Sequence, residues 1–177
     1  MTYWDPLPTV ALLDAGSLFL GTWPQRDWRN VPGPFYGAET DNCWTGRLHA
    51  PDLVLYDDGY GSEFVYRQPR DELETCDLLE AVLADPFGGY AMDGDQHWAP
   101  ADVTAWWRDR QRIIEWTVKA AAVWRISERP EEREVVDGLT AYGASFDSGA
   151  LLEHLRQYTF WLEHGRPARD GERLPEL

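Results

Sequence analysis

In the first 70 residues, apolar positions come in short runs separated by turn-forming residues, a pattern typical of strands. Runs 10–13 and 18–23 flank the Asp-Ala-Gly-Ser cluster at 14–17, and we predict that they pair as a hairpin. Runs 53–56 and 63–66 flank a second turn-forming cluster, and the later run alternates polar and apolar side chains as a half-buried strand does. A second hairpin is therefore predicted over residues 53–66.

Residues 23–50 lack a clear period and are rich in proline, glycine and aromatic side chains. Prolines oppose helix formation and interrupt the hydrogen bonds of a sheet. We predict a long ordered loop here, with at most one short strand.

Helical spacing begins at Pro69 and dominates the rest of the chain. In 69–84 one face carries the apolar residues Leu73, Leu78, Leu79, Val82 and Leu83. In 100–127 the predicted buried stripe is Val103, Trp107, Arg110, Ile114, Thr117, Ala121 and Trp124. Two further helices are predicted, one from Pro130 to about Tyr142 and one from a cap at Asp147 or Ser148 to His164 and Gly165.

Because strands precede helices instead of alternating with them, the predicted class is α+β. We expect N-terminal antiparallel hairpins that form a small sheet, packed against a C-terminal set of about four helices with a long central helix near 100–127. The whole chain, 1–177, is predicted to be one domain, β-rich over 1–68, helical over 69–165, with an extended tail over 166–177.

The composition fits a folded, soluble protein of a reducing compartment. Apolar residues make up 44% of the 177 positions, and ten are tryptophan, which gives enough apolar area for a core. Cys43 and Cys76 show no paired spacing, so we expect free thiols and a cytoplasmic location. The longest apolar window, 117–124, is too short to span a membrane.

Charge narrows the classes of partner. The chain has 31 acidic and 16 basic residues, a formal net charge of −15, which repels nucleic acid and anionic lipid surfaces and attracts basic proteins or cations. The phosphate-binding, zinc-protease and serine-hydrolase motifs GxxxxGK[ST], GxGxxG, HExxH and GxSxG are absent from the sequence.

One loop concentrates chemically active side chains. Asp93, Asp95 and His97 lie within five residues and offer oxygen and nitrogen ligands for a divalent cation, or groups for catalysis. The same Asp-Gly-Asp pattern also serves in ordinary turns, and we favour the turn interpretation. No cofactor is predicted, although a divalent cation is possible.

A second carboxylate pair, Glu39 and Asp41, joins this site if loop 35–44 meets loop 88–98. The assembled group then suits general acid and base catalysis or metal binding. Cys43, in the first of these loops, is a weaker candidate nucleophile.

Candidate binding residues come from the helical half and the aromatic loop. Arg110 interrupts an apolar stripe, so it must meet a carboxylate, such as Glu63 or Asp93, or an anionic ligand. Trp106 and Trp107 are adjacent and cannot both face inward, so Trp106 or Trp116 is expected to be exposed or to lie under a loop. Trp28 and Trp4 are further candidate interface anchors.

Two classes of function remain. The preferred one is an acidic intracellular module that binds a basic protein, of the inhibitor or toxin-neutralising immunity type. The alternative is a small enzyme or metal-dependent protein with an Asp/His site under the glycine-rich and aromatic loops.

Overall fold

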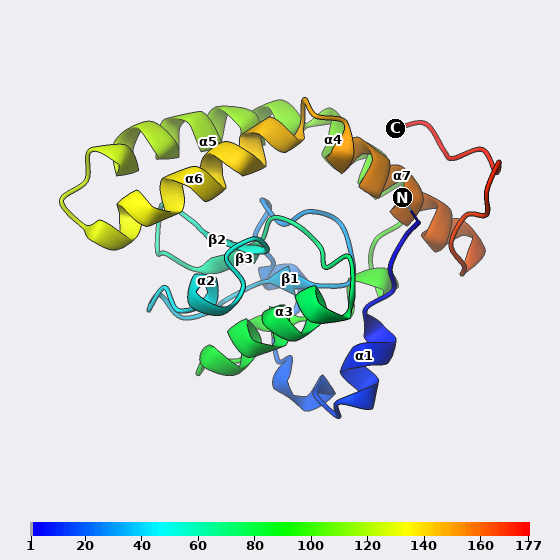
Figure 1. The fold of residues 1–177 in the computed structure, drawn as a ribbon, viewed down its shortest axis with the longest axis horizontal. Helices are drawn as coiled ribbons and strands as arrows, with labels where there is room; N and C mark the ends of the chain where they lie inside the picture. The colour runs from blue at the N-terminus through cyan, green and yellow to red at the C-terminus, as the bar shows by residue number, and fades with distance from the viewer. Residues whose placement is uncertain (1) are drawn as a thin grey trace. The chain divides into compact units, whose positions relative to one another are not determined.

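Short antiparallel strands and one long helix form the first half of the chain, and helices form the second, which makes an α+β fold (Figure 1). The computed structural model describes residues 2–177. It divides into two compact units, Trp4–Trp98 and residues 2–3 with Ala99–Leu177. We call these the N-terminal unit and the C-terminal unit and describe each by itself.

The N-terminal unit contains two antiparallel strand pairs. β2 (Val54–Tyr56) pairs with β3 (Glu63–Val65), which confirms the predicted second hairpin. β1 (Tyr36–Gly37) pairs with β4 (Tyr90–Ala91). The expected small sheet is thus two separate strand pairs, which are linked by hydrogen bonds from a buried side chain.

Asn30 bridges the two strand pairs. Its buried side-chain oxygen accepts hydrogen bonds from the backbone N–H groups of Gly37 and Val65, both at 2.8 Å. Its amide nitrogen donates to the carbonyls of Asp27 and Gly37. A Cβ on Gly37 would lie 2.0 Å from the carbonyl oxygen of Glu63, so only glycine permits β1 to approach β3 this closely.

The predicted long ordered loop is confirmed, and a second buried amide shapes it. Gln68 donates from Nε2 to the carbonyls of Val31 and Phe35, and its Oε1 accepts from the Phe35 N–H. The loop also contains the 3₁₀ turn η2 (Trp23–Gln25) and the single helical turn α2 (Gly46–His49). In this loop, side-chain hydrogen bonds therefore satisfy the buried backbone N–H and C=O groups that a regular sheet would pair with each other.

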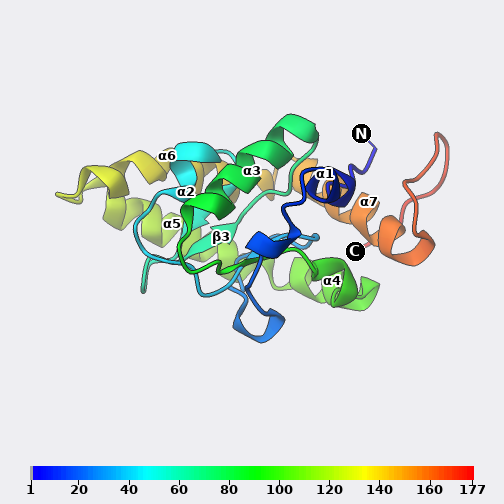
Figure 2. The same ribbon diagram turned by 90° about the horizontal axis from the view of Figure 1, so that it is seen from below.

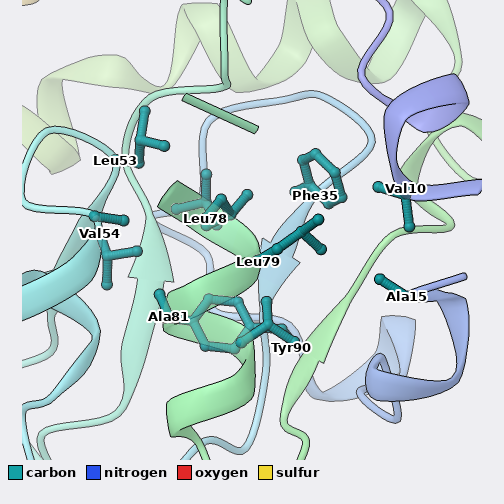
Figure 3. Packing of buried hydrophobic residues seen from close by; sticks show 12 residues of the cluster. Val10, Ala15, Phe35, Leu53, Val54, Leu78, Leu79, Ala81 and Tyr90 are labelled. Atoms are coloured by element: carbon teal, nitrogen blue, oxygen red, sulfur yellow. The ribbon is translucent and has the colours of Figure 1, made fainter. Parts of the chain in front are cut away.

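The core of the N-terminal unit lies along α3 (Glu72–Ala84), which Asp71 caps by accepting from the Glu74 N–H. Leu78 and Leu79 pack with Tyr90 and Phe35, as Figure 3 shows. Of the predicted apolar stripe, Leu78, Leu79 and Val82 are buried. Leu73 and Leu83 are not; their side chains are 77% and 63% exposed.

The predicted first hairpin is wrong. Residues Leu7–Leu12 form helix α1, which begins at a proline pair with the fixed φ that suits a first helical turn. A short apolar run fits a helix as well as a strand, so the pattern alone did not separate the two. After η1 (Gly16–Leu18), the chain pairs elsewhere, since Leu20 and Gly21 donate to the carbonyls of Gly88 and Tyr90.

The predicted helix near 100–127 is present but divided at Asp109 into α4 (Pro100–Arg108) and α5 (Arg110–Arg125). Asp109 has φ −84° and ψ 4°, and the Trp107 carbonyl accepts from the Arg110 guanidinium. The predicted stripe is buried at five positions, Val103, Trp107, Thr117, Ala121 and Trp124, whereas Arg110 and Ile114, just after the break, are only partly buried. Helix α5 also buries Ile113, Trp116 and Ala120, so its buried face is wider than predicted.

The last two predicted helices are confirmed as α6 (Pro130–Ser145) and α7 (Ala150–His164). Figures 1 and 2 show α5 and α6 side by side, and Gly143 lets them approach, since a Cβ there would lie 2.9 Å from Oγ1 of Thr117. The N-cap of α7 is Gly149, in a left-handed conformation, rather than Asp147 or Ser148. Its C-cap is Gly165, as predicted.

Candidate functional site

Asp93 and His97 form a hydrogen-bonded pair across the 3₁₀ turn η3 (Gly94–Gln96). Nε2 of His97 lies 3.0 Å from Oδ2 of Asp93, and the Tyr36 hydroxyl donates to Oδ1 at 2.6 Å. Burial raises the pKa of Asp93, but the bonds from Tyr36 and His97 outweigh it, and the net pKa is lowered. Burial, followed by the Asp93 contact, raises the pKa of Tyr36.

Aromatic rings hold this pair in place. Trp23 stacks on the His97 imidazole with centroids 4.8 Å apart and meets Tyr36 and Trp98 edge-on. The Arg26 guanidinium lies 3.8 Å from the Trp23 ring centroid on the same cluster. A carboxylate that orients an imidazole is the arrangement a general base requires, and it also satisfies the turn, as the sequence allowed.

The other proposed site residues do not join Asp93 and His97. The loops meet, because Tyr36 pairs with Ala91 and Gly37 with Tyr90, but in an antiparallel pair the chain after β1 runs back beside the residues that precede β4. The backbone N–H of Asp41 therefore donates to the carboxylate of Asp85, on the side of the strand pair away from the His97 turn.

The metal interpretation finds no complete ligand set. Glu39 is exposed, and Asp95 is only partly buried in η3. Within residues 2–177, no three His, Cys, Asp or Glu side chains come together in an arrangement that would hold a metal ion. Asp93 and His97 contribute two donors, fewer than the three or four protein ligands that a zinc site uses.

Sequence reasoning missed a group of buried carboxylates formed by Asp41, Glu63 and Asp85. Glu63 accepts from the Gly46 N–H at 2.8 Å and from the Tyr90 hydroxyl at 2.5 Å. Burial raises its pKa to about 7, against the lowering effect of these two bonds, and the negative charges of Asp41 and Asp85 add to the rise.

Backbone N–H groups hold the two aspartates of this group. Asp85 accepts from the N–H groups of Asp41, Phe87 and Gly89, and Asp41 accepts from that of Cys43. Asp41 in turn raises the pKa of the Cys43 thiol, with help from Glu63 and Asp85. A thiol with a raised pKa forms less of the reactive thiolate, which argues against Cys43 as a nucleophile.

An open pocket of about 600 Å³ is lined by residues bonded to this carboxylate group: Thr40 Oγ1 accepts from the Glu63 N–H, and the Gly89 N–H donates to Asp85. Glu39, Thr40 and Ser62 supply polar walls, and the exposed rings of Tyr60 and Phe87 lie at its edge. These two rings are among the large apolar side chains that the fold leaves exposed, and the sequence pattern did not single them out. Neither Asp93 nor His97 lines this pocket.

The tryptophans and Arg110 proposed for binding are engaged within the fold. Trp116 is buried, and Trp106 is partly buried and stacks on Phe146. Trp28 lies under the Arg29 guanidinium, and Trp4 donates from Nε1 to Thr75.

Arg110 is not the buried ion-pair partner that the sequence suggested. It is partly buried, and its guanidinium lies over the Trp107 ring and donates to the Trp107 carbonyl. The carboxylates suggested for it have other partners within the N-terminal unit: Glu63 binds Tyr90, and Asp93 binds Tyr36 and His97.

Negative charge is concentrated in the N-terminal unit. Residues 4–98 carry 17 acidic and 5 basic side chains, a difference of −12, whereas residues 99–177 carry 14 and 11, a difference of −3. The five basic residues, all arginines, are each bound within the unit. Arg29 pairs with Asp27 and Asp58, and Arg67 and Arg70 pair with Glu74. Arg26 and Arg47 donate to backbone carbonyls.

Comparison of the chain with protein-family models, with curated proteins and with solved structures finds no match. In the part of the chain that the structure describes, no helix combines the length and apolarity needed to cross a bilayer.

Proposed function

We propose that this protein is an acidic binding module that recognises a basic protein partner, in the manner of an inhibitor or a toxin-neutralising immunity protein. The supporting observation is the charge of the N-terminal unit, −12 from 17 acidic and 5 basic residues. A surface field of one sign speeds the encounter with a partner of the opposite sign and rejects partners of the same sign. Nucleic acid and anionic membranes are thereby disfavoured.

The internal engagement of the five arginines strengthens this proposal. Arg29, Arg67 and Arg70 pair with carboxylates, and Arg26 and Arg47 donate to backbone carbonyls. All five are counted in the net charge, so twelve acidic side chains of this unit have no basic residue of the unit to balance them. Glu39, Asp52, Glu72 and Asp77 are exposed, so their charges reach a partner through solvent. Cys43 and Cys76 are free thiols, which is consistent with a cytoplasmic protein.

The test is affinity capture from the native host at low and at physiological salt, with mass spectrometry of the bound proteins. We expect a strongly basic protein whose association with the purified chain slows at least tenfold as salt rises, because salt screens the field. One variant neutralises four exposed acids of the N-terminal unit, Glu39→Gln, Asp52→Asn, Glu72→Gln and Asp77→Asn. This variant, which changes the net charge of the unit from −12 to −8, should associate more slowly at low salt and show a weaker salt dependence.

A matched control has the same net charge but a different distribution. It neutralises four exposed acids of the C-terminal unit, Glu128→Gln, Glu134→Gln, Asp137→Asn and Glu163→Gln. We expect this control to associate nearly as fast as the natural sequence. Equal slowing by both variants, or a partner of neutral or acidic charge, would contradict the proposal.

A second candidate function, a small enzyme, is favoured by the Asp93–His97 pair. The carboxylate orients the imidazole at 3.0 Å, and the Trp23 ring fixes its plane, so a substrate proton at Nδ1 would meet a positioned base. Under the binding proposal this pair is structural, and the two proposals differ in what its removal does.

The double variant Asp93→Ala, His97→Ala tests this difference. Both side chains are partly exposed, 40% for Asp93 and 34% for His97, so we expect the variant to fold and to capture the same basic protein with an affinity changed by less than about threefold. Loss of a turnover that the natural chain catalyses, or loss of a bound metal in elemental analysis, would support the enzyme instead.

A further inference from the structure

A groove of about 410 Å³ opens on the N-terminal unit between α3 and the segment that follows α1. One wall comes from residues 13–18 and the other from one face of α3. The lining residues are Leu13, Asp14, Ala15, Ser17, Leu18, Cys76, Leu79, Glu80 and Leu83. This groove is separate from the Asp93–His97 pair and from the pocket beside Glu39, and it shares no lining residue with either.

Leucine side chains give the groove an apolar surface that the fold itself does not use. Leu79 is buried and forms its floor, whereas Leu13 and Leu83 on opposite walls are 53% and 63% exposed. Apolar side chains from two separate segments thus line one groove and remain open to a partner.

The charged side chains that line the groove are acidic, and one of them, Glu80, lies 3.3 Å from Nδ1 of His49. Asp14 lines the first wall and Glu80 the second, and the exposed Asp77 lies one turn before Glu80 on α3. Arginine and lysine are absent from the lining residues. An apolar groove with an acidic rim is complementary to a segment that combines apolar anchors with basic flanks.

The spacing on α3 matches a helical occupant. Cys76, Leu79 and Leu83 lie at i, i+3 and i+7, so they form a stripe along the helix axis. A straight stripe of this kind receives an amphipathic helix whose own anchors recur at i, i+3, i+4 and i+7. The part of α3 that lines the groove, residues 76–83, extends about 10 Å, the length of about two helical turns.

We propose that this groove binds a basic amphipathic helix of the partner protein, with apolar side chains between Leu13 and Leu83 and arginines or lysines beside Asp14 and Glu80. The inference rests on the proposed function and names the surface and the kind of segment involved. A second copy of this chain is a poorer occupant, because a two-fold contact would bring two acidic rims together. An anionic membrane is repelled by the same charges.

The test uses synthetic peptides and the complete chain. The probe is an amphipathic Leu/Arg peptide of about 18 residues, or five helical turns. A peptide of the same composition with its leucines scattered around the helix serves as a control. We expect the amphipathic peptide to shift backbone amide resonances of residues 13–18 and 76–83 and to slow alkylation of Cys76, but not of the exposed Cys43. The scattered peptide should bind at least tenfold more weakly.

Substitutions locate the contact. Leu13→Ser with Leu83→Ser should weaken the amphipathic peptide about tenfold, a typical loss when two anchors are removed. Both side chains are already exposed, so the double variant should fold normally. Leu48→Ser, a control at a side chain that is 77% exposed on α2, should bind as the natural chain does.

Each contrary outcome is distinct. Equal binding of both peptides, or resonance shifts confined to the pocket beside Glu39, overturns the groove but leaves the proposed function standing. An absence of peptide binding even at low salt also overturns the groove. Self-association that is lost in the Leu13→Ser, Leu83→Ser variant assigns this surface to a second copy, and binding to vesicles of anionic lipid assigns it to a membrane. Failure of the charge variants above refutes the proposed function itself.

Discussion

Replacement of Asn30 by aspartate is expected to lower the free energy of unfolding by at least about 3 kcal/mol, a large fraction of the 5–15 kcal/mol typical of a domain. The Asn30 amide nitrogen donates to the carbonyl oxygens of Asp27 and Gly37 at 2.7 and 2.8 Å. A carboxylate can only accept, so it would face two carbonyl oxygens in a buried site.

Asn30→Ala should cost a similar amount for a different reason. It leaves the N–H groups of Gly37 and Val65 without the acceptor they share, and a buried unsatisfied group costs about 1–3 kcal/mol. Urea unfolding followed by tryptophan fluorescence measures both variants. Asn42→Ala, at an exposed asparagine of the same unit, is the control and should change stability by less than about 0.5 kcal/mol. Equal stability of the position-30 and position-42 variants would refute the bridging role.

Glu63→Gln is expected to become more stable relative to the natural chain as the pH rises from 5 to 8. Burial raises the Glu63 pKa in the folded protein to about 7, from 4.5 in the unfolded chain. Between these values the folded state holds the extra proton, so the stability that Glu63 contributes is complete below pH 4.5 and is lost as the pH passes 7. Glutamine imitates the neutral carboxylic acid and removes this dependence.

The size of the effect follows from the shift. A change of about 2.5 pKa units corresponds to about 3 kcal/mol, so the difference in unfolding free energy between variant and natural chain should change by up to this amount between pH 5 and pH 8. Urea titrations at several pH values measure it. Glu72→Gln, at an exposed position, is the matched control. A difference that stays constant with pH would mean that Glu63 is ionised in the folded protein throughout this range, which would refute its raised pKa.

Where the sequence carried strong local signals, it predicted the fold. The hairpin of β2 and β3 has alternating residues and a turn-forming cluster between its strands, and α6 and α7 begin and end near proline and glycine signals. The first hairpin failed because residues 10–13 are too few to separate a strand from a helical turn. The break at Asp109 was missed because the apolar period continues through it.

The candidate site was predictable only where it is local in sequence. Asp93 and His97 are four residues apart, and a short turn brings them together. Tyr36 completes the group through the pairing of β1 with β4, which are only two residues each and carry no pattern to detect. The burial of Glu63 beside Asp41 and Asp85 was missed because Glu63 occupies a polar position of an alternating strand, whereas every residue of β3 is buried.

The exposed Leu83 shows that hydrophobic periodicity does not by itself predict burial. Helical spacing placed Leu83 on the buried face of α3 with Leu79, but the neighbouring segment 13–18 stops short of covering it. Periodicity identifies which side chains share a face, whereas burial depends on what the rest of the chain brings to that face. The proposed partner helix is what would complete this coverage.

Asn30 also determines how well two backbone amides of the strand pairs are protected from hydrogen exchange. Its side-chain oxygen accepts hydrogen bonds from the N–H groups of Gly37 and Val65. These two amides are therefore protected from deuterium exchange, although neither donates within the β1–β4 or the β2–β3 ladder. Hydrogen–deuterium exchange would then show β1, β2, β3 and β4 as one cooperatively protected unit. Loss of the Asn30 hydrogen bonds would expose all four strands to exchange together.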